Sequence, residues 1–537
     1  MESIELKALV DRKNNRVILV ESEEDFVDVL FSFLTMPLGK IIYLACHTDP
    51  AVEQGCLNNL YKSVISLDRR LLRKGVSKSV LIGPPNGAAT HWIDLKLKID
   101  GLGDRLFCFG CGDRNCLATE NMPFSHYIGT ICACGNPMNH AMIVIHDELK
   151  NAGSDPQEGG VFVRGMSRFV TSDELRVCPP STTASFPFFS KFGVEDASSV
   201  EEMTFKVGLP EVLNLLKNSL ISKTPLTDTL LEKPKEIPEL SDESLDQESS
   251  LDKLLCMTDS LLGFFFQTLN LMKSSLIPKK ALKEVPEKKM PESGLNVFGE
   301  EISLKRDIGE LASKITGKIP IRLMLCKSKR IVCYAEAGKD FVDLLFSFLA
   351  LPLGYIAKEA RGTPSKGCIN HLYESVEDLD VEKYFKSHYH KEILLTPKIA
   401  PGFVYENQLL EVEEARAVDH YYYLGGYKIH AGIHSGSVDN AVTVESRSSS
   451  GGFVIKPALF TITDDLVVTP ISTISCVSAM NKLEIPFSDI EERIVYMGKD
   501  EASRLMVASF TSEAALTETF IRKCTSEAAP TENSIVN

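Results

Sequence analysis

The sequence predicts an α+β fold that is built twice along one chain of 537 residues. Residues 25–39 and 340–354 match at 12 of 15 positions, and GCLNNLYKSV at 55–64 returns as GCINHLYESV at 367–376. Each half mixes strand and helix patterns without the regular alternation that produces a parallel α/β sheet. Two similar units of over 200 residues exclude a short-period solenoid, because each is long enough to bury a core.

The elements of one unit follow from its apolar spacing. LKALV and RVILVES, on either side of the polar turn DRKNN, predict an opening β-hairpin. A broad apolar face predicts a helix over 24–36 that ends at Pro37 and Gly39. We expect a second helix over about 55–67, a strand at 92–100 from its strict alternation, strands near 141–146 and 161–170, and a closing helix at 209–221.

Composition divides the chain into predicted segments. The first unit spans 1–231, the second 318–524, and both a linker (232–317) and a tail (525–537) have the polar composition typical of disorder. Within the linker, residues 251–272 have apolar side chains at helical spacing. That helix is expected to dock on a flanking domain, or else to bind a partner in a groove.

Charge and hydropathy limit the classes of function. The chain has 58 Lys and Arg against 73 Asp and Glu, so its net charge is −15, which argues against a protein devoted to binding phosphate backbones. The N-terminus lacks the pattern of a secretory signal, and the apolar window 261–272 is too short to span a bilayer. We therefore expect a cytoplasmic or nucleocytoplasmic location and no membrane association.

Cysteines provide the strongest chemical signal. Five of the 14 fall between Cys108 and Cys134, in an interval where the second unit is 21 residues shorter and has no cysteine. The pairs in CFGCG and CACG predict a structural Zn²⁺ held like a zinc ribbon between residues 108 and 135. The expected ligands are Cys108, Cys111, Cys132 and Cys134, and Cys116, His126 or His140 could replace one of them. Reduced or redox-active thiols without a metal are the alternative.

Two repeated features are weaker candidates for a site. Cys56 and Cys368 begin matching helices, where a thiol could become a nucleophile, although a buried packing role is favoured. The pairs Asp25 with Asp28 and Asp340 with Asp343 could bind a cation or transfer protons; we favour helix capping and a solvated face. In the second unit, the stretch containing His420, His430 and His434 is expected to form a loop or strand edge rather than a metal site.

The ordered motifs resemble a known family. The opening hairpin, DFVDxLFSFLxxPLG, GCxNxLYxSVxxLD, the cysteine pairs, GGFV, TDDLVVTP and the closing helix together resemble the plant domain-of-unknown-function family numbered 674. The similarity covers about 1–231 and 318–521. It implies a plant protein and the shared fold unit, but no activity.

The expected function is that of a non-enzymatic interaction or scaffold module with an unidentified protein partner, because no set of catalytic residue types is repeated with the unit. The alternative is an enzyme that uses Cys56 and Cys368, or the aspartate pairs, as its site.

Overall fold

A computed structural model of the chain describes residues 2–48, 55–99, 106–145, 159–231, 317–431 and 452–522, with short gaps. We refer to the described parts of 1–231 as copy one and of 318–524 as copy two. Both belong to one compact unit, Met1–Lys233 with Gly309–Asn537. The predicted linker helix and tail lie outside the described residues. The domain boundaries therefore stay a prediction.

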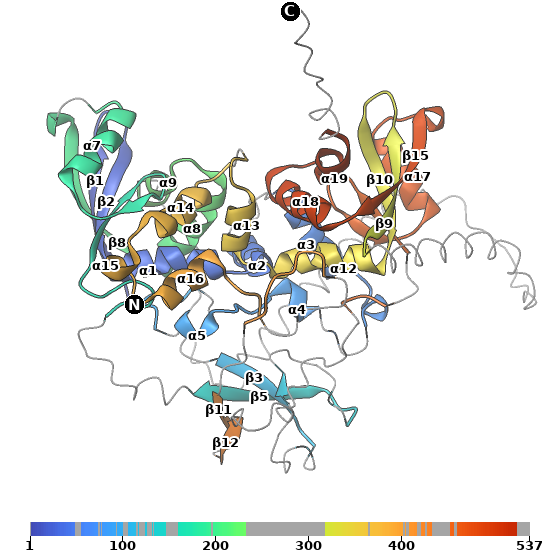
Figure 1. Cartoon of the computed structure of the whole chain (residues 1–537), viewed down its shortest axis with the longest axis horizontal. Coiled ribbons are helices and arrows are strands. Elements are labelled where there is room, and N and C mark those ends of the chain that lie inside the picture. The colour runs from blue at the N-terminus through green and yellow to red at the C-terminus, as the bar shows by residue number, and fades with distance from the viewer. Residues whose placement is uncertain are drawn as a thin grey trace, which may run out of the picture. The chain divides into compact units, whose positions relative to one another are not determined.

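Each copy contains a five-stranded antiparallel sheet, which confirms the predicted α+β class (Figure 1). In copy one the order is β7-β6-β2-β1-β8, made of β1 (Ile4–Asp11), β2 (Arg16–Glu23), β6 (Arg168–Ser172), β7 (Val177–Cys178) and β8 (Val200–Val207). In copy two the matching order is β14-β13-β10-β9-β15, made of β9 (Ile319–Cys326), β10 (Ile331–Gly338), β13 (Leu459–Thr463), β14 (Val468–Pro470) and β15 (Ile490–Met497). The predicted hairpin is β1 with β2, and Asn15 takes the positive φ of 48° that its turn requires.

The predicted long helix is confirmed, and its last turn is a 3-10 helix. In copy one it comprises α1 (Glu24–Ser32) and η1 (Phe33–Thr35), and in copy two α12 (Lys339–Ser347) and η4 (Phe348–Ala350). Pro37 ends this helix as expected, but a further helix begins at once, α2 (Leu38–Thr48) in copy one and α13 (Leu353–Glu359) in copy two. The closing helix has its predicted bounds as α8 (Leu209–Ile221), with α18 (Lys499–Thr511) as its counterpart.

The chain crosses between the copies at the start of these further helices. The N–H of Leu38 donates to the carbonyl of Leu351, and the N–H of Leu353 donates to the carbonyl of Met36. Beyond the crossing, α3 (Leu57–Ser66) of copy one packs against α12 and β14 of copy two. Reciprocally, α14 (Ile369–Asp378) of copy two packs against α1 and β7 of copy one, next to the copy-one sheet in Figure 1. Each sheet is therefore covered partly by the other copy.

The other α-helices of the described residues are α4 (Ser79–Ile82), α5 (Ala89–Trp92), α7 (Thr182–Lys191), α9 (Pro225–Leu230), α15 (Val381–Tyr384), α16 (His388–Leu395), α17 (Thr473–Lys482) and α19 (Ala515–Thr517). Short 3-10 helices are η2 (Arg69–Leu71), η3 (Ala197–Ser199) and η5 (Phe487–Asp489), and η6 (Glu518–Arg522) is a π-helix.

The strand predicted at 92–100 is wrong, since no strand forms among its described residues. Leu95, Leu97 and Ile99 are nevertheless buried while Lys96 between them is exposed. The alternation thus reports a segment of turns and bends that buries every second side chain without pairing to a sheet. Alternating burial and strand pairing are separate properties, and the sequence pattern indicates only the first.

A third five-stranded sheet combines the two copies, in the order β12-β11-β5-β3-β4. Its strands are β3 (Leu106–Cys111), β4 (Phe124–Ser125), β5 (Met138–Ile145), β11 (His420–Leu424) and β12 (Tyr427–Ala431). His430 lies on β12, the outer strand of this sheet, as the strand-edge interpretation expects, whereas His420 begins β11, an inner strand that pairs with β12 and β5. The side chains of both histidines lie outside the described ones, and His434 lies outside the described residues.

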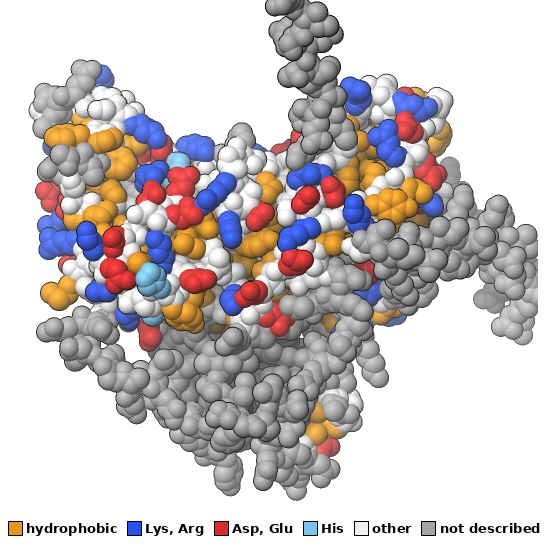
Figure 2. All heavy atoms as spheres, viewed as in Figure 1, with side chains coloured by type: hydrophobic (Ala, Val, Ile, Leu, Met, Phe, Trp, Pro, Cys, Tyr) orange, Lys and Arg blue, Asp and Glu red, His pale blue; other side chains and the backbone are white. Residues whose placement is uncertain are grey.

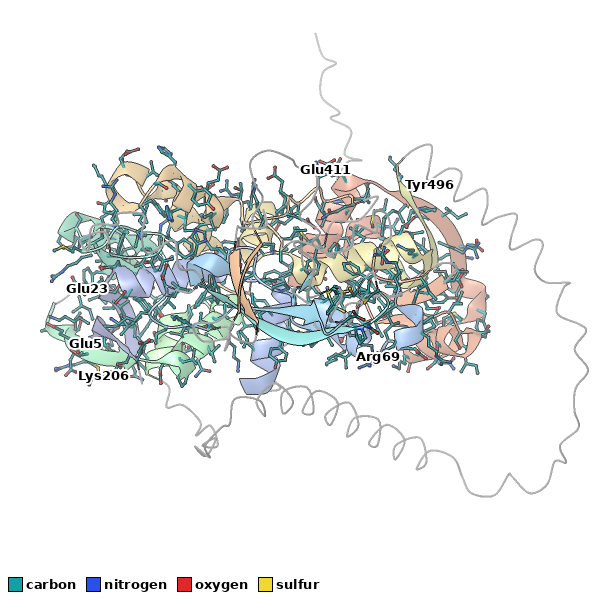
Figure 3. All side chains as sticks on the ribbon, turned by 90° about the horizontal axis from the view of Figure 1, so that it is seen from below. Glu5, Glu23, Arg69, Lys206, Glu411 and Tyr496 are labelled. Carbon is teal, nitrogen blue, oxygen red and sulfur yellow. The ribbon has the colours of Figure 1, made fainter. Side chains whose placement is uncertain are left out.

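The outer strands of the two sheets present different surfaces. In copy one, Glu5 lies opposite Lys206 in the β1–β8 register. At the matching place in copy two, Pro320 lies opposite Tyr496, whose side chain is 47% exposed (Figure 3).

Within the described residues, no helix combines the length and the apolar character that crossing a membrane requires.

Candidate metal centre

Four cysteines come together in the third sheet, where β3 ends and β5 begins. Cys111 is the last residue of β3, and a shift in register between Gly110 and Cys111 interrupts its pairing with β5. Cys132 and Cys134 precede β5, and Cys116 lies in the segment that connects β3 to β5. The four Sγ atoms all lie within 4.8 Å of one another. The four cysteines thus converge because β3 ends beside the start of its antiparallel partner β5.

A tight turn positions the second pair of thiols. The N–H of Gly135 donates to the carbonyl of Cys132 at 2.8 Å, and the N–H of Cys132 donates to the carbonyl of Asn136 at 2.9 Å. Gly135 has φ +91°, which a residue with a side chain rarely adopts. With this turn, the Sγ atoms of Cys132 and Cys134 lie close to those of Cys111 and Cys116.

The distances suit a tetrahedral ion. Cys111 Sγ is 3.4 Å from Cys134 Sγ, and Cys116 Sγ is 3.8 Å from Cys132 Sγ. Four thiolates around Zn²⁺, each about 2.3 Å from the metal, would stand about 3.8 Å apart. A disulfide needs sulfurs about 2.05 Å apart, so neither pair is bonded.

Electrostatics in the cluster favour the thiolate of Cys134 and disfavour those of Cys111 and Cys116. The backbone N–H of Asn136, and then the thiol of Cys111, donate to Cys134 and lower its pKa to about 7. Burial raises the pKa of Cys111, and the hydrogen bond with Cys134 raises that of Cys116. A second negative charge among four close sulfurs is unfavourable unless a cation is present, and a bound metal would deprotonate the thiols outright.

Three of the four predicted ligands are in this cluster, Cys111, Cys132 and Cys134. The fourth member is Cys116, which the sequence offered only as a replacement. Cys108 lies on β3 opposite Met142, and its side chain is outside the described ones. The same is true of His140, which lies opposite Gly110, and His126 is not described at all. The signal for Cys116 was its position five residues after Cys111, a spacing that the expected C-x₂-C pairs did not include.

The cysteines of the repeated Gly-Cys positions are buried. Cys56 is fully buried and Cys368 is 1% exposed. Each thiol points at a backbone carbonyl oxygen, that of Ser512 at 3.1 Å and that of Ser222 at 3.2 Å. Burial raises the pKa of both thiols to about 12. The packing role that we favoured from sequence agrees with this environment.

The repeated aspartates divide into two kinds. Asp25 is partly exposed and pairs with Lys96 at 2.5 Å. Asp28 is only 2% exposed, and its carboxylate accepts hydrogen bonds from the backbone N–H groups of residues 161–163. Burial raises the pKa of Asp28 to about 7. The expectation of a solvated face is therefore wrong for Asp28.

Asp343 repeats this arrangement in copy two. It is fully buried, accepts from the N–H groups of Phe453 and Val454, and pairs with Lys339 one turn earlier on α12. Burial raises the pKa of Asp343 as well. Each carboxylate holds a glycine-containing loop against its helix, residues 160–163 in copy one and 452–454 in copy two, which is a structural task.

The described residues thus form a duplicated α+β fold with one four-cysteine cluster in its first copy. The family model described as "Protein of unknown function (DUF674)" matches residues 1–260 and 264–500. The chain therefore belongs to this family, and the two matches agree with two copies. No curated protein and no solved structure matches the chain.

Proposed function

We propose that the chain is a non-enzymatic interaction scaffold. We also propose that Zn²⁺, bound by Cys111, Cys116, Cys132 and Cys134, holds the end of β3 next to the start of β5 in the third sheet. The observation that carries the metal assignment is the convergence of four sulfurs within 4.8 Å. Four protein ligands complete a tetrahedral zinc shell and leave no position for a reactive water. The ion would therefore stabilise structure and would not catalyse hydrolysis.

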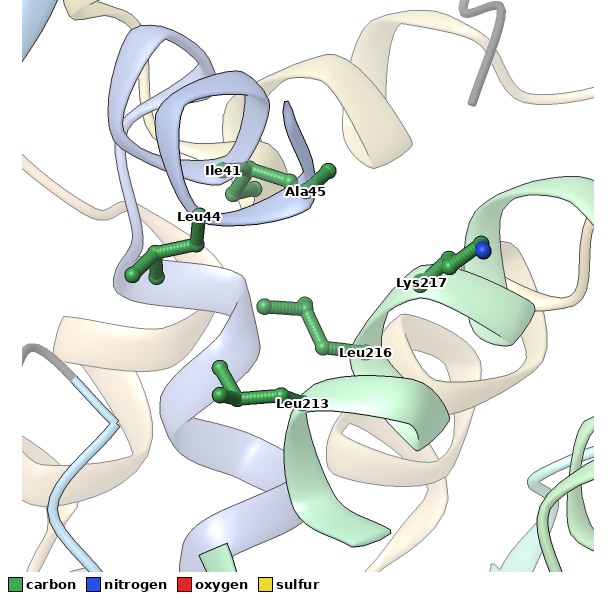
Figure 4. Close-up of a pocket in the computed structure, with 6 residues that line it drawn as sticks. All are labelled: Ile41, Leu44, Ala45, Leu213, Leu216 and Lys217. Atoms are coloured by element: carbon green, nitrogen blue, oxygen red, sulfur yellow. The ribbon is translucent and has the colours of Figure 1, made fainter. Parts of the chain in front are cut away.

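Other features support a scaffold over an enzyme. The thiols of Cys56 and Cys368 are neutral and enclosed, so they lack the properties of a nucleophile. A small hollow between α2 and α8 contains no acid, histidine or cysteine (Figure 4); it is lined by Ile41, Leu44, Ala45, Leu213, Leu216 and Lys217.

The proposed partner is a protein, bound in the cytoplasm or nucleocytoplasm. On the face drawn in Figure 2, acidic and basic side chains alternate over the described surface, so this part of the face has no continuous basic stripe. Binding to nucleic acid depends on such a stripe. Affinity capture with the full chain and with Cys116→Ser would show whether partner binding needs the cysteine cluster.

Zinc content tests the metal assignment. The full chain, purified without chelator, is expected to contain one zinc ion, measured by inductively coupled plasma mass spectrometry. Cys116→Ser and Cys134→Ser should lose it, because three thiolates do not complete the shell. Cys178→Ser is the matched control, since this half-buried thiol lies outside the cluster, and it should keep the ion.

Cys108→Ser separates the two possible ligand sets. Retention of zinc in Cys108→Ser together with its loss in Cys116→Ser supports the cluster described above. The opposite pattern would restore the ligand set predicted from sequence, and an unmutated chain without zinc would refute the metal site altogether.

A further inference from the structure

The contacts between the copies come in matching pairs. The N–H of Cys56 donates to the carbonyl of Ser509 at 2.9 Å, and the N–H of Cys368 donates to the carbonyl of Ser219 at 2.8 Å. The hydroxyl of Ser63 accepts from the N–H of Val468, and the hydroxyl of Ser375 accepts from the N–H of Val177, both at 2.9 Å. Every one of these bonds joins one copy to the other. We call residues 55–73 and 367–386 the exchanged segments.

The start of each exchanged segment completes a helix of the other copy. The last carbonyls of a helix have no partner within it, and the first N–H groups of a helix are likewise unpaired. Here the first turn of α3 meets the last turn of α18, and the first turn of α14 meets the last turn of α8. Donors and acceptors that would otherwise be orphaned are thus paired, and the helix dipoles lie head to tail.

The glycine before each cysteine permits this approach. A Cβ atom on Gly55 would stand 2.8 Å from the carbonyl oxygen of Ser512. On Gly367 it would stand 2.3 Å from the carbonyl oxygen of Ser219. Both distances are too short for a real contact. Contact with the other copy therefore explains why Gly-Cys is repeated, and a nucleophilic cysteine is not needed to explain it.

The ends of the exchanged segments are also held by the other copy. Residues 71–73 pair in antiparallel fashion with residues 453–455, through Arg73 N–H to the carbonyl of Phe453 and Ile455 N–H to that of Leu71. Residues 384–386 pair in the same way with residues 162–164. Phe385 is fully buried, and its ring stacks on that of Phe31 with 6.2 Å between centroids.

We infer that the exchanged segments, and the surfaces that they contact, form a binding site for a second copy of the repeat. Two repeats therefore assemble by reciprocal exchange whether or not they belong to the same polypeptide chain. The contacts in each direction are equivalent, as they are in a symmetric dimer. The partner that fits the surface is a repeat that begins its exchanged segment with Gly-Cys. This inference is independent of the zinc site, because none of the four clustered cysteines takes part in it.

The first experiment cuts the full chain after it has folded. A protease site is placed within residues 240–245, the purified protein is cleaved, and the products are examined by native mass spectrometry and size-exclusion chromatography. The two fragments are expected to stay together as a one-to-one complex and to separate only in denaturant. Separation under native conditions would overturn the inference.

A second experiment distinguishes exchange from side-by-side packing. Ser63→Cys with Val468→Cys should form a disulfide that joins the two fragments on a non-reducing gel, because the Ser63 side chain lies on the Val468 backbone. Ser63→Cys with Val177→Cys tests the equivalent contact within copy one and should not form the bond. A bond in the second variant and not in the first would show that α3 stays with its own copy.

Gly367→Ala should weaken the association of the cleaved halves about tenfold or more, because the added Cβ displaces α14 from the end of α8. Gly83→Ala is the control, since nothing lies within 4 Å of a Cβ at that position. Circular dichroism of both uncut variants confirms that each is folded. Equal affinities for the two variants would contradict the role assigned to the Gly-Cys contact.

Discussion

At the scale of single residues, position on a helix decides what a carboxylate does. Asp25 and Asp28 lie on the same helix three residues apart, yet one contacts solvent and the other accepts three backbone hydrogen bonds in the core. A buried donor without a partner costs about 1–3 kcal/mol, so a buried acceptor that serves several donors is hard to replace. The hydrogen bonds of Asp28, and those of its counterpart Asp343 in copy two, thus account for these buried carboxylates without a catalytic role.

Asp28→Asn is expected to lower the free energy of unfolding by about 1–3 kcal/mol, because an amide offers one acceptor oxygen to N–H groups that the carboxylate serves with two. Urea denaturation monitored by circular dichroism measures the change. Asp25→Asn is the matched control and should cost less than about 1 kcal/mol, since its partner Lys96 is exposed. Equal effects of the two variants would show that the buried hydrogen bonds contribute little.

At the scale of elements, the contact between α5 and α16 joins the copies through aromatic rings. His91 of α5 stacks on Phe162 with 6.0 Å between centroids and meets His390 of α16 edge to face at 5.8 Å. Burial lowers the pKa of His390 to about 4, helped by the charge that His91 gains when it is protonated and by the charge of Lys386. Burial also lowers the pKa of His91. Both rings are therefore neutral near pH 7, which lets them pack closely.

Acid should weaken this contact. The unfolded chain binds a proton at His390 below its ordinary pKa of 6.5, whereas the folded chain binds it only near pH 4. Stability from this group is therefore present above pH 6.5 and is lost as the pH falls toward 4. The unfolding free energy, measured by urea titration from pH 7 to 4.5, should fall less steeply in His390→Gln than in the unmutated chain.

His388→Gln is the control for this titration, because His388 is exposed at the start of the same helix. It should keep the steep fall. A slope in His390→Gln identical to that of the unmutated chain would show that the buried ring pair does not titrate with folding.

The elements themselves were largely predictable, but their partners were not. The apolar spacing of 209–221 gave the bounds of α8, because one apolar stripe at helical period has one interpretation. The same spacing over 55–67 reports only that α3 buries a face. That pattern does not indicate whether the face packs on the sheet of copy one or on the sheet of copy two, which has the same strand order, so the pattern does not reveal the exchange. The cysteine cluster was predictable in three of its residues, since motif spacing describes local turns and Cys116 is brought in by the connection between strands.

At the scale of the whole molecule, exchange merges the interiors of the two copies. Leu60 of α3 and Leu372 of α14 belong to one continuous cluster of buried side chains, which also contains Phe31 of α1 and Phe341 of α12. A domain whose core consists only of its own side chains can unfold alone. Here neither sheet retains its full cover if the other copy unfolds, so opening one copy also exposes apolar side chains of the other to water.

Unfolding of the two sheets should therefore be coupled. Leu60→Ala removes a fully buried side chain of copy one, at a cost of about 2–5 kcal/mol. Hydrogen exchange measured by mass spectrometry should show an equal loss of protection in β2 of copy one and β10 of copy two, and denaturation should remain a single transition. Leu372→Ala, the equivalent change in α14, should give the same decrease in both strands. Two separate transitions, or a loss confined to one sheet in each variant, would mean that the copies are independent domains and that the exchanged helices add little to either core.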